Sequence, residues 1–511
     1  MPNRNCMLGV DIGSSNMKVD FLDTTGRILG SASRELLTTY PHPDWAEQDP
    51  EEWFLALQQC AADIFDKQGC NRADLGAICI TAAAHTPVLL GKDDRILRPA
   101  ILWTDRRSAE ECAILNQQHG EHIYQAAFHK VTPTWTLPQL FWLKRHEPEV
   151  ASVVERLFVA KDYLRYRLTG VWATDVIDAQ GTLLYDYEKE EWSKDICGFI
   201  DWPLHTLPPV RATTDCAGVV TAQAARATGL PEGVPVIMGG SDTALEDYGA
   251  GAIEHGQGII KIATAGNVNI MSNAPRKHPL LFNYRQVIPR LWNVLTGTLS
   301  GAQVHKWLRD QFFTELTVND QEKSNAFATI DKLAGQISPG SDGLLFHPYL
   351  MGERTPYMDP FLRGDYLGIT IRHTRAHFVR ALYEGISFSL LDCKNVYKSV
   401  GMEMADIRLI GGGAKSPLWR QILCDVIGQE LMVPQNHDAS FGAALVAGVG
   451  AGLFPDAEDA VSKCVRISVR HQPDMRQHER YMKLFDLYLT GQKLLVELNH
   501  KLHALEMDSK I

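Results

Sequence analysis

The 511-residue chain lacks the closely paired cysteines that metal sites and disulfide scaffolds need. Its ten cysteines are scattered without a C-x-x-C pair, and the closest two, Cys70 and Cys79, are nine residues apart. Structural zinc sites and small disulfide-stapled folds are built on much shorter or regular spacings. The cysteine pattern argues against both, and it predicts a reducing, cytoplasmic environment.

The sequence also lacks a basic block and a long apolar run. The formal net charge is -11, so we expect no nucleic-acid partner. The longest weakly polar run, residues 443–454, is too short to cross a bilayer, and Asp11 interrupts the first apolar run. We therefore expect neither a membrane partner nor a signal peptide. An anionic ligand is still compatible, because backbone N–H groups at turns and helix starts can hold phosphate.

Two nucleotide-binding fingerprints are absent as well. No G-x-x-x-x-G-K-[ST] run occurs, which excludes a P-loop. The glycine run at residues 411–413 fails as a dinucleotide fingerprint, because Ser416 stands where the third glycine belongs. The sequence therefore disfavours a dinucleotide-dependent oxidoreductase.

The central stretch from Val234 to Ala244 carries the first sign of chemistry. With 45% hydrophobic and 22% charged residues, the chain has a globular composition, and its length predicts two domains. An apolar run over residues 234–238 predicts a buried strand, and Gly239, Gly240 and Asp242 follow it. A carboxylate at a strand end between two halves is well placed to take a proton from a bound alcohol. In the alternative interpretation, Asp242 lies in a surface turn and caps the next helix.

The N-terminus is predicted to form three antiparallel strands, over residues 7–10, 18–23 and 28–31. A tight Gly/Ser turn over residues 11–16 separates the first two and can present N–H groups to phosphate. Asp11 at its start can hold Mg²⁺ through water, because Mg²⁺ prefers few protein carboxylates. Alternatively the hairpin is plain and Asp11 is only a turn residue.

A histidine follows the next predicted strand. Residues 77–80 form the strand, and a row of small residues ending in Ala84 precedes His85. A histidine at a strand end beside small residues could donate a hydrogen bond to a substrate hydroxyl. The alternative is a structural histidine with partners in the protein.

The second half of the chain repeats the pattern of the first. Residues 258–270 again give strand, small-residue turn and strand, and residues 292–295 predict a third strand. Two domains with facing turns of this kind would clamp a polyphosphate, although the echo is in pattern and not in sequence, so coincidence is an alternative. After a strand at residues 407–410, Gly411–Ala414 would let a base and ribose lie against bare backbone. Ser416 then caps a helix.

In this order, the features resemble the FGGY family of carbohydrate kinases along nearly the whole chain. The runs that carry the resemblance are Gly9–Ser15 with Lys18, Gly239–Asp242, Gly364–Ile369, Glu384-Gly385 and Gly411–Ala414. Within the family the chain is most similar to the xylulose kinases, on residues 98–103, 352–356 and 416–423.

The resemblance implies an α/β fold of two actin-like (ribonuclease-H-like) domains, with an interdomain cleft that closes on ATP and sugar. It places the sugar site and base in an N-terminal domain (1–250), the ATP site in a C-terminal domain (251–490), and a C-terminal helix and tail at 491–511. The implied function is ATP-dependent phosphorylation of a sugar hydroxyl, first of a ketopentose such as xylulose. ATP and Mg²⁺ are the implied cofactors, and a homodimer is an open option.

The resemblance also implies roles for individual residues. Asp242 is the catalytic base and, with Asp11, a metal ligand. The sugar contacts are Ala84, His85, Asp242 and Thr243. The ATP site consists of Ser14, Ser15, Lys18, Thr264, Gly266, Asn267, Gly301, Gly411, Gly412, Gly413, Ala414 and Ser416.

Three positions depart from the family pattern. Ala83-Ala84 stand where such kinases usually have Gln-Met, Thr243 stands in place of Asn, and Gln139 stands in place of Lys. Smaller side chains before His85 enlarge or reshape the sugar pocket, so another polyol, aldonate or ketose is an alternative substrate. The alternative outside the enzymes is a non-catalytic, nucleotide-gated binding protein on the same actin-like plan.

Overall fold

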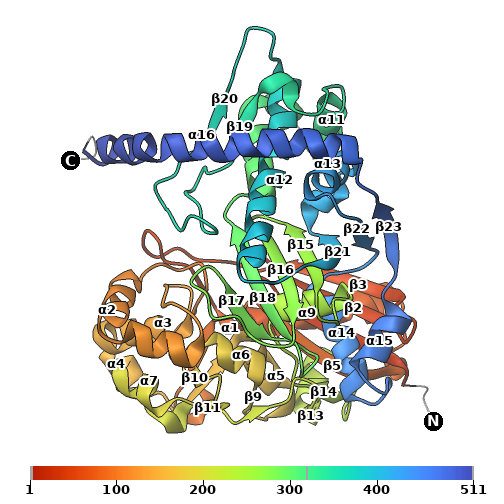
Figure 1. Ribbon diagram of the computed structural model, residues 1–511. Helices are drawn as coiled ribbons and strands as arrows, with labels where there is room; N and C mark the ends of the chain where they lie inside the picture. The colour runs from red at the N-terminus through yellow and green to blue at the C-terminus, as the bar shows by residue number, and fades with distance from the viewer. Residues whose placement is uncertain (1–3, 318–319, 509–511) are drawn as a thin grey trace.

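The structure, a computed structural model, describes residues 4–317 and 320–508, and each half of the chain is built on one mixed sheet (Figure 1). The first sheet has the order β13 (Cys216–Val219), β14 (Pro235–Ile237), β5 (Leu75–Ala82), β1 (Cys6–Ile12), β2 (Asn16–Asp23), β3 (Ile28–Glu35). The second has the order β17 (Phe282–Arg285), β18 (Trp292–Thr298), β16 (Gly266–Ser272), β15 (Gln257–Ile262), β21 (Ala405–Ile410), β22 (Leu431–Pro434), β23 (Ile467–His471).

The two sheets share one plan. β1 pairs antiparallel with β2, β2 with β3, and β1 pairs parallel with β5. In the same way β15 pairs antiparallel with β16, β16 with β18, and β15 pairs parallel with β21. The echo seen in the sequence is therefore a structural repeat, and the predicted fold class of two actin-like α/β domains is confirmed.

Helices cover both sheets. Those of the first half are α1 (Pro50–Ala62), α2 (Ala109–Ala127), α3 (Thr136–His146), α4 (Pro148–Ala151), α5 (Ala160–Thr169), α6 (Val176–Gly181), α7 (Lys194–Phe199), α8 (Ala222–Thr228) and α9 (Asp242–Gly249). Those of the second half are α10 (Ala302–Phe312), α11 (Asp320–Ala334), α12 (Arg375–Ser399), α13 (Pro417–Ile427), α14 (Ala439–Gly450), α15 (Ala457–Cys464) and α16 (Met475–Asp508).

Short two-stranded pairings complete the fold. They join β4 (Glu47–Gln48) to β7 (Ala100–Ile101), β6 (Pro87–Leu90) to β8 (Arg156–Val159), β9 (Thr174–Asp175) to β12 (Val210–Arg211), β10 (Tyr185–Asp186) to β11 (Glu191–Trp192), and β19 (Leu345–His347) to β20 (Asp365–Leu367). α16 crosses the far end of the second half as one continuous helix, which runs through residue 491 without a break (Figure 1). None of the described helices is long and apolar enough to cross a membrane.

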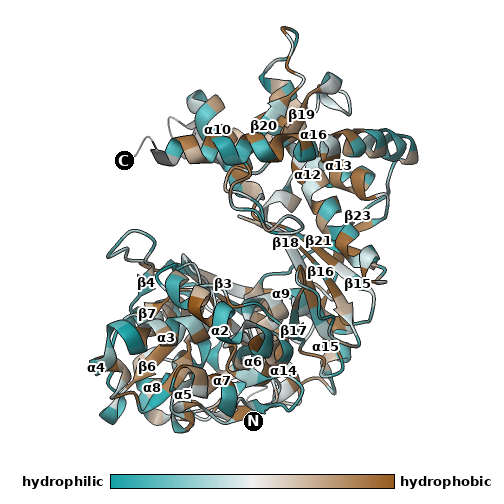
Figure 2. Cartoon of the chain, turned by 60° about the vertical axis from the view of Figure 1, so that its left-hand side comes forward, coloured by the Kyte–Doolittle hydropathy of each residue, from teal (hydrophilic) through white to brown (hydrophobic). Residues whose placement is uncertain are grey.

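The two halves meet at a shared hydrophobic core between the two sheets. Met7 and Cys79 from the first sheet pack in this core with Ile259 and Ile410 from the second. α14, which is late in the chain, lies on β1 and β5 of the first sheet and against α9. Figure 2 shows α9 at the junction of the two halves. Since α9 begins at Asp242, the shared core fixes this residue between the sheets.

Candidate active site

Residues predicted for catalysis lie at the carboxyl ends of three adjacent strands. β1 and β14 both run parallel to β5. Asp11 on β1 is paired in register with Thr81 on β5, and the Thr81 hydroxyl donates to the Gly240 carbonyl over 2.7 Å. In open α/β sheets ligands bind at this end of the strands. The sheet therefore brings together Asp11, the end of β5 and Asp242 from distant parts of the chain.

Asp242 is the first residue of α9 and follows Ser241, the N-cap residue. Its carboxylate accepts hydrogen bonds from the Thr243 backbone N–H at 2.7 Å and from the Thr243 hydroxyl at 3.3 Å. Burial raises the pKa of Asp242; Lys261 opposes this shift and Glu246 adds to it. Asp242 is half-buried between the two halves, which differs from the exposed turn of the alternative interpretation. An aspartate whose pKa is raised is a stronger base than a free one.

Asp11 belongs to the same group of charges. Burial raises the pKa of Asp11 well above its usual range, and Asp242 and Glu246 raise it further. Lys261 on β15 forms an ion pair with Glu246 and lowers the pKa of both aspartates. The Asp11 Oδ1 atom is buried and has no hydrogen-bond partner among the described residues.

This donor set fits one hydrated magnesium ion. Mg²⁺ usually takes one or two protein carboxylates and completes its shell with water and phosphate oxygens. Asp11 and Asp242 supply two carboxylates, one with an unpartnered buried oxygen. Over residues 4–317 and 320–508, no group of three or more His, Cys, Asp or Glu side chains is arranged to hold a metal. Asp11 and Asp242 are therefore the side chains that would hold the ion, which would neutralise phosphate charge there.

His85 lies just beyond β5 with a backbone φ of 69°, a left-handed conformation that is uncommon outside glycine. Its Nδ1 lies 2.5 Å from the Gly181 carbonyl on α6. A carbonyl can only accept, so Nδ1 carries the proton, and burial lowers the pKa of His85 to about 4. The neutral ring then offers only a lone pair at Nε2. The sequence-based expectation of a donor is corrected: toward a hydroxyl, His85 accepts.

Aromatic side chains surround His85, and the sequence patterns did not identify them. Trp135 packs edge-on at 4.5 Å between ring centroids, and Tyr284 lies at 6.3 Å. Tyr284 comes from β17 of the second sheet, which reaches across to α6. Burial raises the pKa of Tyr284; Arg354 lowers it and Asp242 raises it.

The ATP-binding residues predicted in the second half surround one turn. Thr264 lies in the turn between β15 and β16, and Gly266 and Asn267 begin β16. A Cβ atom on Gly301 would come within 2.3 Å of the Ala263 carbonyl, and one on Gly411 within 2.6 Å of the Ile262 carbonyl. Both glycines therefore permit close approach to this turn.

The glycine-rich turn after β21 continues toward α13. Gly413 and Ala414 are buried, and the Ser416 hydroxyl caps α13 by accepting from the Trp419 N–H at 3.0 Å. A Cβ atom on Gly412 would meet nothing within 4 Å among the described residues. The backbone therefore borders open space here, as a nucleoside pocket requires.

In the first half, the predicted phosphate turn joins β1 to β2. The Ser14 hydroxyl accepts from Trp103 Nε1 at 2.9 Å, and Ser15 is exposed. Lys18 forms an ion pair with Asp438, at the start of α14, and lies 3.3 Å from Asp20. Lys415 after β21 also contributes to lowering the pKa of Asp438. Lys18 is thus tied to the second half beside the glycine-rich turn, while its charge is already shared with carboxylates.

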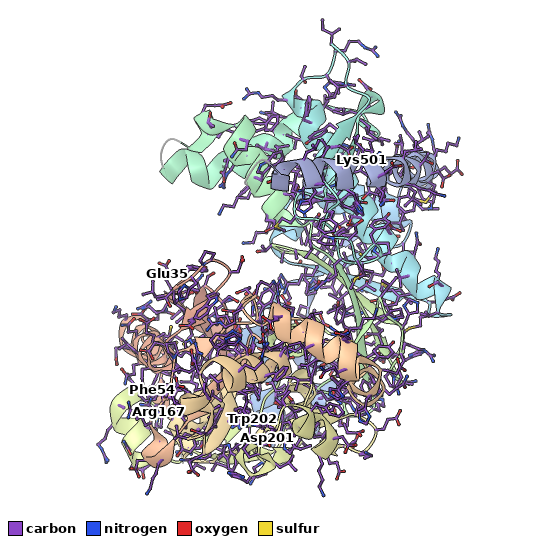
Figure 3. The ribbon with its side chains drawn as sticks, turned by 90° about the vertical axis from the view of Figure 1, so that its left-hand side faces the viewer. Glu35, Phe54, Arg167, Asp201, Trp202 and Lys501 are labelled. Carbon is purple, nitrogen blue, oxygen red and sulfur yellow. The ribbon has the colours of Figure 1, made fainter. Side chains whose placement is uncertain are left out.

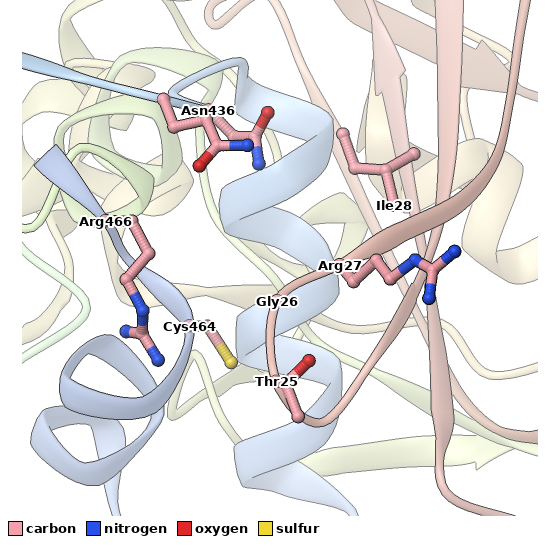
Figure 4. Close-up of a pocket in the computed structure, with 8 residues that line it drawn as sticks. Thr25, Gly26, Arg27, Ile28, Asn436, Cys464 and Arg466 are labelled. Carbon is pink, nitrogen blue, oxygen red and sulfur yellow. The ribbon is translucent and has the colours of Figure 1, made fainter. Parts of the chain in front are cut away.

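Two cavities lie elsewhere. One of about 310 Å³ borders the β2–β3 turn and includes Arg27, Asn436 and Arg466 (Figure 4). This turn is at the end of the sheet opposite Asp11, because Cys6 pairs with Asp23. Another of about 410 Å³ is lined by α1, α5 and α8, where the Arg167 guanidinium lies 4.4 Å from the Phe54 ring (Figure 3). Neither cavity is lined by Asp11, His85 or Asp242.

Comparison with known proteins agrees with this geometry. The models of the FGGY family of carbohydrate kinases match residues 6–249 (N-terminal domain) and 260–451 (C-terminal domain). The chain is 31% identical to a xylulose kinase of Bacillus subtilis over 94% of its own length and 95% of that protein.

Two solved structures extend the comparison. A xylulose kinase of Rhodospirillum rubrum superposes with a TM-score of 0.88 at 28% identity, covering 97% of this chain and all of that one. A gluconate kinase of Lactobacillus acidophilus gives 0.86 at 25% identity, covering 96% of this chain and 98% of that one. With both domains matched and the same fold across nearly its full length, the chain belongs to the FGGY family of carbohydrate kinases and is an ATP-dependent sugar kinase.

Proposed function

We propose that this kinase transfers the γ-phosphoryl group of ATP to a hydroxyl of a ketopentose such as xylulose, with Asp242 as the general base. The observation that carries the proposal is the position of Asp242. It begins α9 between the two sheets, shares its electrostatic environment with Asp11 and Lys261, and has a pKa raised by burial. The similarity to xylulose kinases supports the ketopentose.

In the proposed mechanism, the turn at residues 264–267 and the glycines after β21 hold ATP, while His85 accepts a hydrogen bond from the sugar. Asp242 takes the proton of the attacking hydroxyl. Phosphoryl transfer passes through a loose transition state, so orientation and charge neutralisation supply most of the rate enhancement. Bound Mg²⁺ neutralises phosphate charge, and Asp11 and Asp242 are the side chains that would hold it. Closure over the sugar excludes water and limits ATP hydrolysis.

The assignment of the sugar site and base to residues 1–250 and of the ATP site to residues 251–490 is part of the same proposal. Ser14, Ser15 and Lys18 would then face the phosphates from the first half. The homodimer stays a prediction.

An aldonate is the second candidate substrate. Ala83-Ala84 leave more room before His85 than the Gln-Met of related kinases, and the chain is similar to a protein described as a gluconate kinase. ADP release measured over ketopentoses, pentitols, aldonates and glycerol decides between them. The highest kcat/KM on a ketopentose supports the first candidate, and the highest on an aldonate replaces it with the second.

The role of Asp242 is tested with Asp242→Asn. General-base catalysis contributes about 10²–10⁴-fold, so kcat should fall by roughly that factor on every sugar that wild type accepts. Asp201→Asn, whose side chain is 96% exposed, is the control and should keep wild-type activity. Thermal unfolding checks that both variants fold. Near-normal turnover by a folded Asp242→Asn protein would overturn the assignment.

A further inference from the structure

Arg354 is a half-buried arginine without a carboxylate partner. Its Nε donates to the Gly297 carbonyl at 3.2 Å, and its Nη2 donates to Asn267 Oδ1 at 3.3 Å. No ion pair to Arg354 occurs within residues 4–317 and 320–508, whereas the buried Arg98, Arg165 and Arg380 each pair with a carboxylate. Burying an unpaired charge is costly, so such a charge usually has a function.

The segment around Arg354 holds the guanidinium in place. Glu353 is buried and accepts from the Leu299 and Arg354 backbone N–H groups at 2.8 and 2.6 Å, and from the Thr298 hydroxyl. The Thr355 N–H donates to the same Gly297 carbonyl at 3.1 Å. A Cβ atom on Gly297 would come within 2.3 Å of Arg354 Nη2, so the guanidinium rests directly against this glycine. The side chain is thus preorganised, as transition-state stabilisation requires.

The contacts of Arg354 join the turn assigned to the ATP phosphates to β17, the strand that carries Tyr284 beside His85. Asn267 follows directly on the turn assigned to the ATP phosphates. The Arg354 guanidinium also lies 5.5 Å from the Phe282 ring on β17, the strand that carries Tyr284. A group bound beside the phosphate turn would meet a guanidinium that has no carboxylate partner among the described residues, so it is expected to be anionic.

We propose that Arg354 is a further catalytic residue, whose guanidinium binds the phosphoryl group during its transfer; this inference rests on the proposed function. The bond between the γ-phosphorus and the β–γ bridging oxygen breaks, and its electron pair stays on ADP. A new bond forms from the sugar oxygen to phosphorus, and the hydroxyl proton goes to Asp242. Arg354 forms no covalent bond. Its N–H groups donate hydrogen bonds to the oxygens of the phosphoryl group during the transfer.

Kinetics test this role with Arg354→Met and Arg354→Lys. Loss of one preorganised donor to a developing charge costs about 10²–10³ in kcat, so Arg354→Met should lose that factor while the KM for a neutral sugar stays close to wild type. Arg354→Lys keeps the charge without the planar fork and should recover part of the loss. Added guanidinium ion should partly rescue Arg354→Met. Arg375→Met, at an exposed arginine paired with Glu315, is the matched control.

A binding measurement tests the same inference without any sugar. Mg²⁺·ADP with beryllium fluoride imitates a bound phosphoryl group, and calorimetry should show tighter binding of this complex than of Mg²⁺·ADP in wild type and in Arg375→Met. In Arg354→Met this difference should disappear while ADP binds as in wild type. This result would support the proposed role of Arg354 in binding the phosphoryl group, even if the Asp242→Asn variant showed that Asp242 is not the base.

Several outcomes would overturn the inference. If the beryllium fluoride complex keeps its advantage in Arg354→Met, the guanidinium does not bind the phosphoryl group. If only the KM for aldonates rises, the anion that Arg354 recognises is a sugar carboxylate. Equal loss of ADP affinity and thermal stability in both Arg354 variants would indicate a structural role.

Discussion

At the scale of single residues, His85 shows how backbone contacts decide chemistry. The Gly181 carbonyl fixes the proton on Nδ1, and a Cβ atom at Gly181 would lie 3.1 Å from the His85 ring. Because burial lowers the pKa of His85 to about 4, the ring is neutral at physiological pH. Its Nε2 is then a fixed acceptor, which in the proposed function would select a substrate by the position of one hydroxyl.

We predict that His85→Ala raises the sugar KM by roughly tenfold, the effect of about 1.4 kcal/mol and within the range of one hydrogen bond. The KM for ATP should not change, since His85 is not among the residues proposed to bind ATP. His85→Gln, which can present an oxygen acceptor, should lose less. Steady-state kinetics from pH 5 to 8 are the measurement. A sugar KM that follows a titration near the ordinary histidine value of 6.5 would contradict the low pKa.

At the scale of elements, the close contact between α14 and α9 depends on glycine. A Cβ atom on Gly442 would lie 1.8 Å from the Leu245 carbonyl, and one on Gly9 would lie 1.8 Å from the Ser440 carbonyl. α14 therefore lies directly against α9 and β1, backbone to backbone. This packing holds the start of α9, and so Asp242, against the first sheet.

We predict that Gly442→Ala destabilises the protein by about 1–3 kcal/mol or more, since backbone atoms must move to admit the methyl group. The matched control is Gly198→Ala in α7, where a Cβ atom would meet no described atom within 4 Å. That change should be neutral or slightly stabilising, because alanine favours a helix by up to about 1 kcal/mol over glycine. Urea denaturation compares the two, and equal effects would contradict the close-contact argument.

The sequence predicted those elements whose formation depends on neighbouring residues in the chain. The hairpin from β1 to β2, its repeat from β15 to β16, and Ser416 as the cap of α13 could all be predicted, because alternation, turn residues and caps are local. The position of Asp242 at a strand end was predicted for the same reason. The sequence could not place β17 beside α6 or Arg354 beside Asn267, because those contacts join segments far apart in the chain and leave no periodic trace. The Gly352–Pro356 motif could be seen in the sequence. The role proposed for Arg354 could not, because it depends on the contact with Asn267 after the β15–β16 turn.

At the scale of the whole molecule, α9 connects the two halves through charged and polar contacts as well as through the shared core. Glu246 pairs with Lys261 on β15. Asp247 accepts from Asn269 on β16 at 2.8 Å and from Asn293 on β18 at 2.6 Å. The helix that begins at the proposed base is therefore anchored to the second sheet.

Asp247 makes this connection sensitive to pH. Burial raises the pKa of Asp247 to about 8, Glu246 raises it further, and the two asparagines and Lys261 oppose the shift. The folded chain then holds this proton more tightly than the unfolded chain, where the group has its ordinary pKa near 3.8. The contribution of Asp247 to stability is therefore largest at acid pH and is lost as the pH rises toward about 8.

We predict that Asp247→Asn removes this loss, since an amide keeps an oxygen for both asparagines and does not ionise. Between pH 6 and pH 8, the stability of the variant relative to wild type should rise by roughly 2–3 kcal/mol, because each pKa unit of difference corresponds to about 1.4 kcal/mol. Urea denaturation of both proteins at the two pH values is the measurement, with Asp201→Asn as an exposed control that should follow wild type. Parallel curves for Asp247→Asn and wild type would mean that this carboxyl is already ionised at pH 6 and that the junction does not respond to pH through it.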